Sequence, residues 1–186
     1  MKAQKPIIGI FLLFCSLLAV HAVTEDGIIS EGEYSRQASF DKDNFKLYWQ
    51  VEGDKVFFAI DAAAPGWVAV GFDPGTVMSS CDMVFGIVKE DGSVQAIDAW
   101  SSGIFGPHPA DVDQGGKNDI LAFAGARRGN RVTFEFSRLL NTGDSHDKVL
   151  PAEGQLRIIW AYATNVSFTA KHARTGNATI SLGGNK

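Results

Sequence analysis

The sequence predicts an all-β protein, built as an antiparallel β-sandwich in a single domain. Three observations lead to this fold class. About nine short apolar segments recur along the chain, and several alternate apolar and polar residues with the period of two that a strand requires. Turns rich in glycine and aspartate separate these segments. No stretch carries a long apolar stripe with the helical period of 3.6 residues.

The predicted strands begin with a hairpin and continue with two central strands. Residues 45–51 alternate between two faces, and residues 55–61 return after a turn at Gly53-Asp54. Residues 67–72 and 83–88 are apolar on both faces, which indicates strands at the centre of a sheet. The remaining predicted strands cover residues 94–100, 120–123, 131–136, 156–162 and 178–182, with one helical turn expected at residues 137–141.

Residues 1–22 are expected to be a secretory signal peptide. Lys2 and Lys5 precede an apolar run, and Val20-His21-Ala22 places small residues where a signal peptidase reads them. The run is shorter than the roughly 20 apolar residues that span a membrane, although an uncleaved anchor is the alternative. We therefore expect a secreted or periplasmic protein, with one domain at residues 23–186 and no membrane span in the mature chain.

The charge and cysteine content of the mature chain exclude several classes of protein. Removal of the leader takes away two lysines and no acid, which leaves 15 basic and 21 acidic side chains and a formal charge of −6. Such a balance argues against nucleic acid and anionic membrane surfaces as partners. Only Cys81 remains, so no intrachain disulfide can form, and this thiol is predicted to be a small buried apolar group.

Met78 and His172 are the most informative candidates for a functional site. Each lies in a polar, glycine-flanked segment between apolar strands. A thioether and a neutral imidazole together fill both axial positions of an iron porphyrin, which suits electron transfer. Met83 is a competing sulfur donor, but it begins an apolar strand, so packing is the predicted role. His108 and His146 are predicted to face solvent. Asp82 and Arg138 are predicted to serve in structural pairing or turn-capping rather than in chemistry.

Five segments of the chain, in the same order, resemble the motifs of the DOMON domain family. They are Asp26-Gly-Ile-Ile-Ser-Glu-Gly-Glu-Tyr34, Gly66-Trp-Val-Ala-Val-Gly-Phe72, Met78-Ser-Ser-Cys-Asp-Met-Val84, Phe136-Ser-Arg-Leu-Leu-Asn-Thr-Gly-Asp144, and Trp160-Ala-Tyr followed by His172-Ala-Arg-Thr-Gly176. The resemblance covers nearly the whole mature chain. It implies an immunoglobulin-like sandwich, similar to the cytochrome domain of cellobiose dehydrogenase and the haem subunit of ethylbenzene dehydrogenase.

The resemblance also implies a cofactor, haem b, with Met78 and His172 as its axial ligands. No Cys-x-x-Cys-His motif is present, so the haem is expected to be held non-covalently. Trp67 and Phe72, from one predicted strand, are expected to line the cofactor site. Other aromatic residues that could wall the site are Phe85, Trp100, Trp160 and Phe168.

Three functions follow from these observations. The first is an exported b-type cytochrome domain, not an enzyme by itself, that exchanges single electrons with an unidentified redox protein. The second is a haem-free carbohydrate-binding or adhesion module, because some members of the family bind sugars and a fold does not decide a ligand. The third is a mononuclear copper site made by Cys81, His108, His172 and Met78. Sequence motifs of hydrolases, zinc proteases and phosphate-binding loops are absent.

Residues 101–118 form a long loop rich in glycine, proline and aspartate, and such loops are often functional. It is either a plain surface loop or, as we expect for a functional loop, it borders the open edge of the cofactor and presents Asp111 and Asp113 to a basic redox partner. Asn165 and Asn177 lie in glycosylation sequons, which matter only in a eukaryote.

Overall fold

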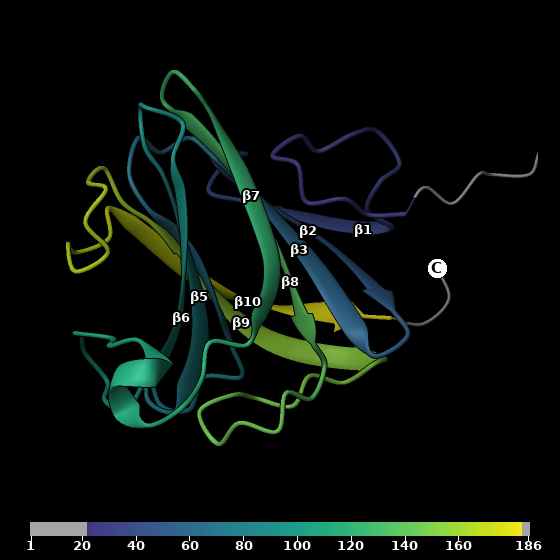
Figure 1. Cartoon of the computed structure of the whole chain (residues 1–186), viewed down its shortest axis with the longest axis vertical. Coiled ribbons are helices and arrows are strands. Elements are labelled where there is room, and N and C mark those ends of the chain that lie inside the picture. Colours follow the sequence, from purple (N-terminus) through teal and green to yellow (C-terminus); the bar gives the residue numbers. More distant parts are fainter. Residues whose placement is uncertain (1–21, 184–186) are drawn as a thin grey trace, which may run out of the picture.

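The computed structural model describes residues 22–183, in which ten strands and one short 3-10 helix form two antiparallel sheets of five strands each. The two sheets face one another, so the predicted all-β sandwich is confirmed (Figure 1). The expected signal peptide lies outside the described residues, except for Ala22. Within the described part, no helix is long and apolar enough to cross a membrane.

The first sheet has the strand order β1-β2-β3-β8-β7. Its strands are β1 (Arg36–Phe40), β2 (Phe45–Glu52), β3 (Lys55–Ala62), β8 (Arg131–Leu139) and β7 (Ile120–Arg128). The predicted hairpin is confirmed, because β2 and β3 pair in register with Val51 opposite Val56. Its turn uses Gly53 at a φ of 63°, a conformation that glycine adopts without strain.

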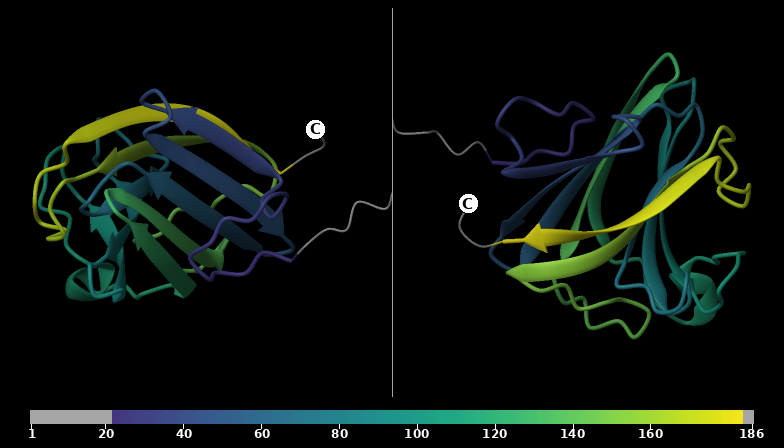
Figure 2. Two further views of the ribbon diagram at one scale, coloured as in Figure 1. Left: turned by 90° about the horizontal axis from the view of Figure 1, so that it is seen from above. Right: turned by 180° about the vertical axis from the view of Figure 1, so that it is seen from behind.

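The second sheet has the strand order β10-β9-β4-β5-β6. Its strands are β10 (Arg174–Leu182), β9 (Gly154–Tyr162), β4 (Val68–Phe72), β5 (Cys81–Val88) and β6 (Val94–Ser101). Every residue of β4 and β5 is buried, and both strands have neighbours on each side. The prediction that these two segments are central strands is therefore confirmed. Figure 2 shows how the second sheet wraps across the first.

Several elements differ from the sequence-based expectation, and β7 and β10 extend beyond the segments 120–123 and 178–182 predicted for them. The strand β1 was not expected, because its residues lack an apolar run, yet it pairs with β2 along its whole length. The helical turn expected at residues 137–141 is wrong, since β8 continues to Leu139. The backbone is extended there because Arg138 pairs with Val56 of β3 and with Ile120 of β7. The helix η1 (Asp111–Gln114) lies instead in the long loop after β6.

The core between the sheets is built from aromatic rings. Phe58 stands 5.1 Å from Phe72 and 5.4 Å from Phe136, measured between ring centroids, and all three are fully buried. Burying each such ring contributes about 1.5–3 kcal/mol relative to exposure. Phe134 lies directly on Gly86, where an added Cβ atom would come 2.2 Å from the ring. Only glycine allows the two sheets to approach this closely there.

A second apolar cluster covers the outer face of the second sheet. Its buried members are Trp67, Ala69, Cys81, Met83, Phe85, Ile87, Ala99 and Ala163. Successive residues of a strand point to opposite faces, so these positions alternate with the positions that fill the core between the sheets. Since the first sheet lies on the other side, loops must cover this cluster, and the candidate site lies between the cluster and those loops.

Candidate functional site

A cavity of about 500 Å³ lies over the outer face of the second sheet. Strands β4, β5 and β9 form its floor, and three loops form its walls. Figure 1 shows the β9–β10 loop on the side of the second sheet that faces away from the first. Residues that line the cavity from loops are Met78, Phe105, Gly106, Pro107, His108, Phe168, Thr169, Ala170, Lys171 and His172. The volume is within the range of about 300–1,000 Å³ found for small-molecule and cofactor sites.

Met78 and His172 both line this cavity, although they come from different loops. Met78 lies in a tight turn between β4 and β5, where the Ser79 amide donates to the Thr76 carbonyl at 3.0 Å. His172 is half-buried, and the amide of the next residue, Ala173, donates to the Tyr162 carbonyl at 2.8 Å. The fold thus brings the two predicted ligands to one cavity, and their ligation of iron remains a prediction.

Trp67 and Phe72, the two predicted wall residues, lie on opposite faces of the second sheet. Trp67 lines the cavity and meets Phe85 edge-on at 5.2 Å. Its indole Nε1 donates to the Ala170 carbonyl at 3.1 Å, which ties the His172 loop to the sheet. Phe72 is outside the cavity, because the period of two along the strand turns its ring into the core against Phe58.

The remaining aromatic candidates are also divided. Phe85, Phe168 and Trp160 line the cavity, and the rings of Phe85 and Phe168 meet edge-on at 6.3 Å. Trp100 lies elsewhere, beside His146 at 5.9 Å. His146 therefore also lies outside the cavity, and its substitution can serve as a control for the histidines that line the cavity.

His108 was expected to face solvent, and that expectation is wrong. Its half-buried ring lines the cavity, 6.4 Å from the Phe85 ring. Burial lowers the pKa of the His108 imidazole, and nearby His172 lowers it further. The Nδ1 atom is buried without a hydrogen-bond partner among the described residues. A neutral imidazole with a free nitrogen is the form that binds metals. The flanking glycine and prolines of its loop suggested exposure, so His108 was not expected to line the cavity.

Cys81 does not join the other proposed copper ligands at the cavity. It is fully buried, as predicted, and its Sγ lies 3.5 Å from the Phe72 carbonyl oxygen. Burial raises the pKa of the thiol to about 12. Cys81 is absent from the cavity lining, so the copper set loses the sulfur donor that makes blue-copper sites distinctive.

The long loop after β6 contributes to the cavity but does not display both of its acids. Residues 105–108 of this loop line the cavity, as an edge-bordering loop would. Asp113 is exposed, whereas Asp111 is only 1% exposed. The expectation that Asp111 faces a partner is therefore wrong. The 3-10 turn η1 points this side chain inward, toward a second group of polar residues.

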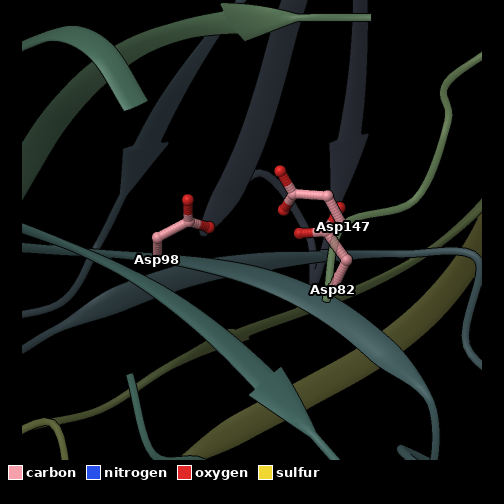
Figure 3. Close-up of side chains that lie close together, drawn as sticks. All are labelled: Asp82, Asp98 and Asp147. Carbon is pink, nitrogen blue, oxygen red and sulfur yellow. The ribbon is translucent and has the colours of Figure 1, made fainter. Parts of the chain in front are cut away.

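That second group is a buried cluster of carboxylates at one end of the sandwich. Asp82 of β5, Asp98 of β6 and Asp147 of the β8–β9 loop offer oxygens within 4.8 Å of one another. Figure 3 shows the three carboxylates turned toward a common point. Arg138 pairs with Asp82, and its Nη2 lies 3.4 Å from Asp147 Oδ2. A structural role was predicted for Asp82 and Arg138, whereas the cluster was not expected.

Comparison with known proteins places the fold in a family. The family model of the DOMON domain matches residues 41–163, about two thirds of the chain. DBH-like monooxygenase protein 1 of Mus musculus is 28% identical over 116 residues, which cover 62% of this chain and 18% of that protein. MOXD1 homolog 2 of Drosophila melanogaster is 26% identical over 120 residues, covering 64% and 15% respectively. The chain thus spans less than a fifth of the length of these relatives. The matched residues include most of the sandwich. The chain therefore belongs to the DOMON domain family.

Proposed function

We propose that this domain binds haem b non-covalently in the outer cavity and transfers single electrons, with Met78 and His172 as the axial ligands. One observation carries the proposal. Two thioethers, Met78 and Met83, and two imidazoles, His108 and His172, line one cavity whose other walls are mainly apolar. Both are kinds of donor that hold haem iron. We further propose that the protein is exported and exchanges electrons with a separate redox protein.

The chemistry of the cavity suits the proposed cofactor. Trp67, Phe85 and Phe168 supply flat apolar surface for a porphyrin, which is large and mostly apolar. Lys171 lies at the cavity wall and is exposed, so its ammonium group can pair with a carboxylate of the cofactor. His108 gives the cavity a second imidazole and Met83 a second thioether, and both are competitors of Met78 for the second axial position.

Bound haem would supply a one-electron couple, and the residues of this chain would hold and tune it. The hydrogen bond from Trp67 to the Ala170 carbonyl fixes the loop that carries His172. The tight turn around Met78 limits the positions of its sulfur. Thioether ligation favours the ferrous state and raises the potential.

The comparisons are compatible with this role. The murine relative is named a monooxygenase, and monooxygenation consumes electrons. We propose that this domain is not the catalyst by itself. Carbohydrate binding is the less favoured alternative, because a sugar needs many hydrogen-bonding groups and the floor of this cavity offers few.

The test is a titration of purified protein with haemin, followed by optical spectroscopy. We expect saturation at one haem per chain and a low-spin, six-coordinate spectrum on reduction. His172→Ala should lose most of its haem, whereas Met78→Ala should retain part of it with a lower potential. His146→Ala is the matched control, since that histidine lies outside the cavity, and it should behave as the parent protein.

Three outcomes would count against the proposal. A haemin titration without saturation would refute haem binding, and measurable binding on a glycan array would then favour the carbohydrate module. If His108→Ala abolishes the low-spin spectrum while Met78→Ala is silent, the second ligand is His108. Copper in protein prepared without added metal would revive the copper site, with two imidazoles and a thioether but no thiolate.

A further inference from the structure

We infer that Asp82, Asp98, Asp111 and Asp147 form a buried site for a divalent cation, calcium by preference, at the end of the sandwich. The inference does not depend on haem, because these residues do not line the outer cavity. It rests on how the four carboxylates are placed and on which of their oxygens have partners.

The strands bring the first two carboxylates together. In the β5–β6 pairing, Asp82 lies opposite Trp100 and Asp98 lies opposite Val84. The two aspartates are therefore diagonal neighbours, and the period of two places both on the face that looks toward the first sheet. Asp147 reaches the same point from the β8–β9 loop (Figure 3). A cation there would join segments that are far apart in the sequence.

Asp82 and Asp98 each have one carboxylate oxygen that accepts hydrogen bonds and one that has no partner among the described residues. Asp82 Oδ2 accepts from Arg138 and from the Lys148 amide at 2.9 Å, and Asp98 Oδ2 accepts from the Asp119 amide at 2.8 Å. The other oxygen of each, Oδ1, is buried without a hydrogen-bond partner in the described part of the chain. Backbone donors thus fix each carboxylate through one oxygen, while its second oxygen stays open toward the cluster. Metal-binding carboxylates are commonly oriented by such hydrogen bonds.

Asp111 and Asp147 add further free oxygens. Asp111 is 1% exposed, and neither of its carboxylate oxygens has a hydrogen-bond partner among the described residues. An isolated bridge between Ala99 and Ala110 holds Asp111 beside the strand that carries Asp98, next to the group of three carboxylates. Both oxygens of Asp147 lack hydrogen bonds as well, although Arg138 lies near one of them. Buried polar atoms in native proteins rarely stay unpartnered, so a group absent from these contacts is expected to satisfy them.

The charges of the cluster point to a cation. Four carboxylates face a single buried cation, Arg138, while Lys148 directs its ammonium group toward Asp73 at 3.7 Å. Three of these carboxylates place oxygens within 4.8 Å of one another, so the group needs compensating positive charge from protons or from a metal ion. The neighbouring Asp119 and Asp144 add negative charge, which favours the metal ion further.

The donor set indicates which cation fits. Free donors of this cluster are carboxylate oxygens, which hard cations prefer over softer transition metals. Calcium takes about six to eight oxygens in flexible geometry, whereas magnesium demands a near-ideal octahedron and keeps several waters. Ligands drawn from two strands, a 3-10 turn and a loop suit the more tolerant ion.

The test measures binding of calcium to the full folded protein after removal of metal with a chelator. Calorimetric titration should show one calcium per chain, with magnesium binding at least tenfold more weakly. Asp98→Asn and Asp111→Asn should each weaken calcium binding by at least tenfold. Asp91→Asn, in the exposed β5–β6 turn, is the matched control and should bind calcium as the parent does.

Two results would overturn the inference. One is the absence of saturable calcium or magnesium binding by folded, chelator-treated protein. The other is unchanged calcium affinity in both Asp98→Asn and Asp111→Asn. Because Asp98 lies on a strand, Asp111→Asn guards against misfolding of the first variant, and near-ultraviolet circular dichroism verifies the fold of each. If binding is absent, protons neutralise the cluster instead.

Discussion

Metal-free protein is expected to become less stable as the pH rises from 5 to 7, because the buried carboxylates hold protons in the folded state. Burial raises the pKa of Asp98 to about 7, whereas a carboxyl in the unfolded chain titrates near 4. Between these values the folded state binds a proton that the unfolded state has released. Stability from this group is present at low pH and is lost as the pH rises through the folded pKa.

The magnitude follows from linkage. One extra proton bound by the folded state changes the free energy of unfolding by about 1.4 kcal/mol per pH unit. From pH 5 to pH 7, Asp98 alone therefore removes about 2–3 kcal/mol, and this is an upper limit because the carboxylates titrate together. Burial lowers the pKa of His108, which has the opposite effect on stability over part of this range. The comparison must therefore be made with a variant.

The assay is urea unfolding at several pH values with a chelator present, for the parent protein and for Asp98→Asn. The parent should show the larger loss of stability between pH 5 and pH 7, and the difference between the two curves isolates the carboxyl. Saturating calcium should reverse the slope in the parent, because the metal binds the ionised form. Parallel curves for the parent and the variant would refute the reasoning.

Three further predictions concern packing and the cofactor site. Arg138→Met leaves buried carboxylates without their cation and should cost about 3–5 kcal/mol of unfolding free energy in metal-free protein, measured by urea unfolding. Gly86→Ala forces a methyl group into the Phe134 ring and should cost about 1–3 kcal/mol; if adding Phe134→Leu recovers none of this loss, steric crowding is not its cause. Trp67→Phe removes the hydrogen bond to the Ala170 carbonyl and should cost about 0.5–1.5 kcal/mol, together with faster haem loss in stopped-flow transfer to apomyoglobin; an unchanged rate would show that this bond does not hold the loop.

The sandwich could be predicted because its central strands are strongly apolar. The segments that became β4 and β5 are apolar on both faces, and that pattern survives any error in register. The edge strand β1 carries a mixed, half-exposed pattern, so only its pairing with β2 reveals it. The turn expected near Arg138 failed for a related reason, since pairing with β3 and β7 decides the conformation there.

The candidate site was predicted only where residue chemistry was unusual for its segment. Met78 and His172 stand out as soft or basic donors in polar loops, and the fold brings both to the cavity. His108 did not stand out, because its glycine and proline neighbours resemble any exposed loop. The carboxylate cluster was missed because its members come from β5, β6, η1 and a loop, and no local spacing links them.

The alternation along residues 67–72, which are β4 and the residue before it, separates substitutions that affect the core from substitutions that affect the cavity. Val68, Val70 and Phe72 belong to the core between the sheets, whereas Trp67 and Ala69 belong to the outer cluster beneath the cavity. Substitutions at the even positions should therefore act on folding, and those at the odd positions on the ligand. A domain of this design can exchange one bound molecule for another over generations without rebuilding its scaffold, because the two properties are encoded in interleaved residues.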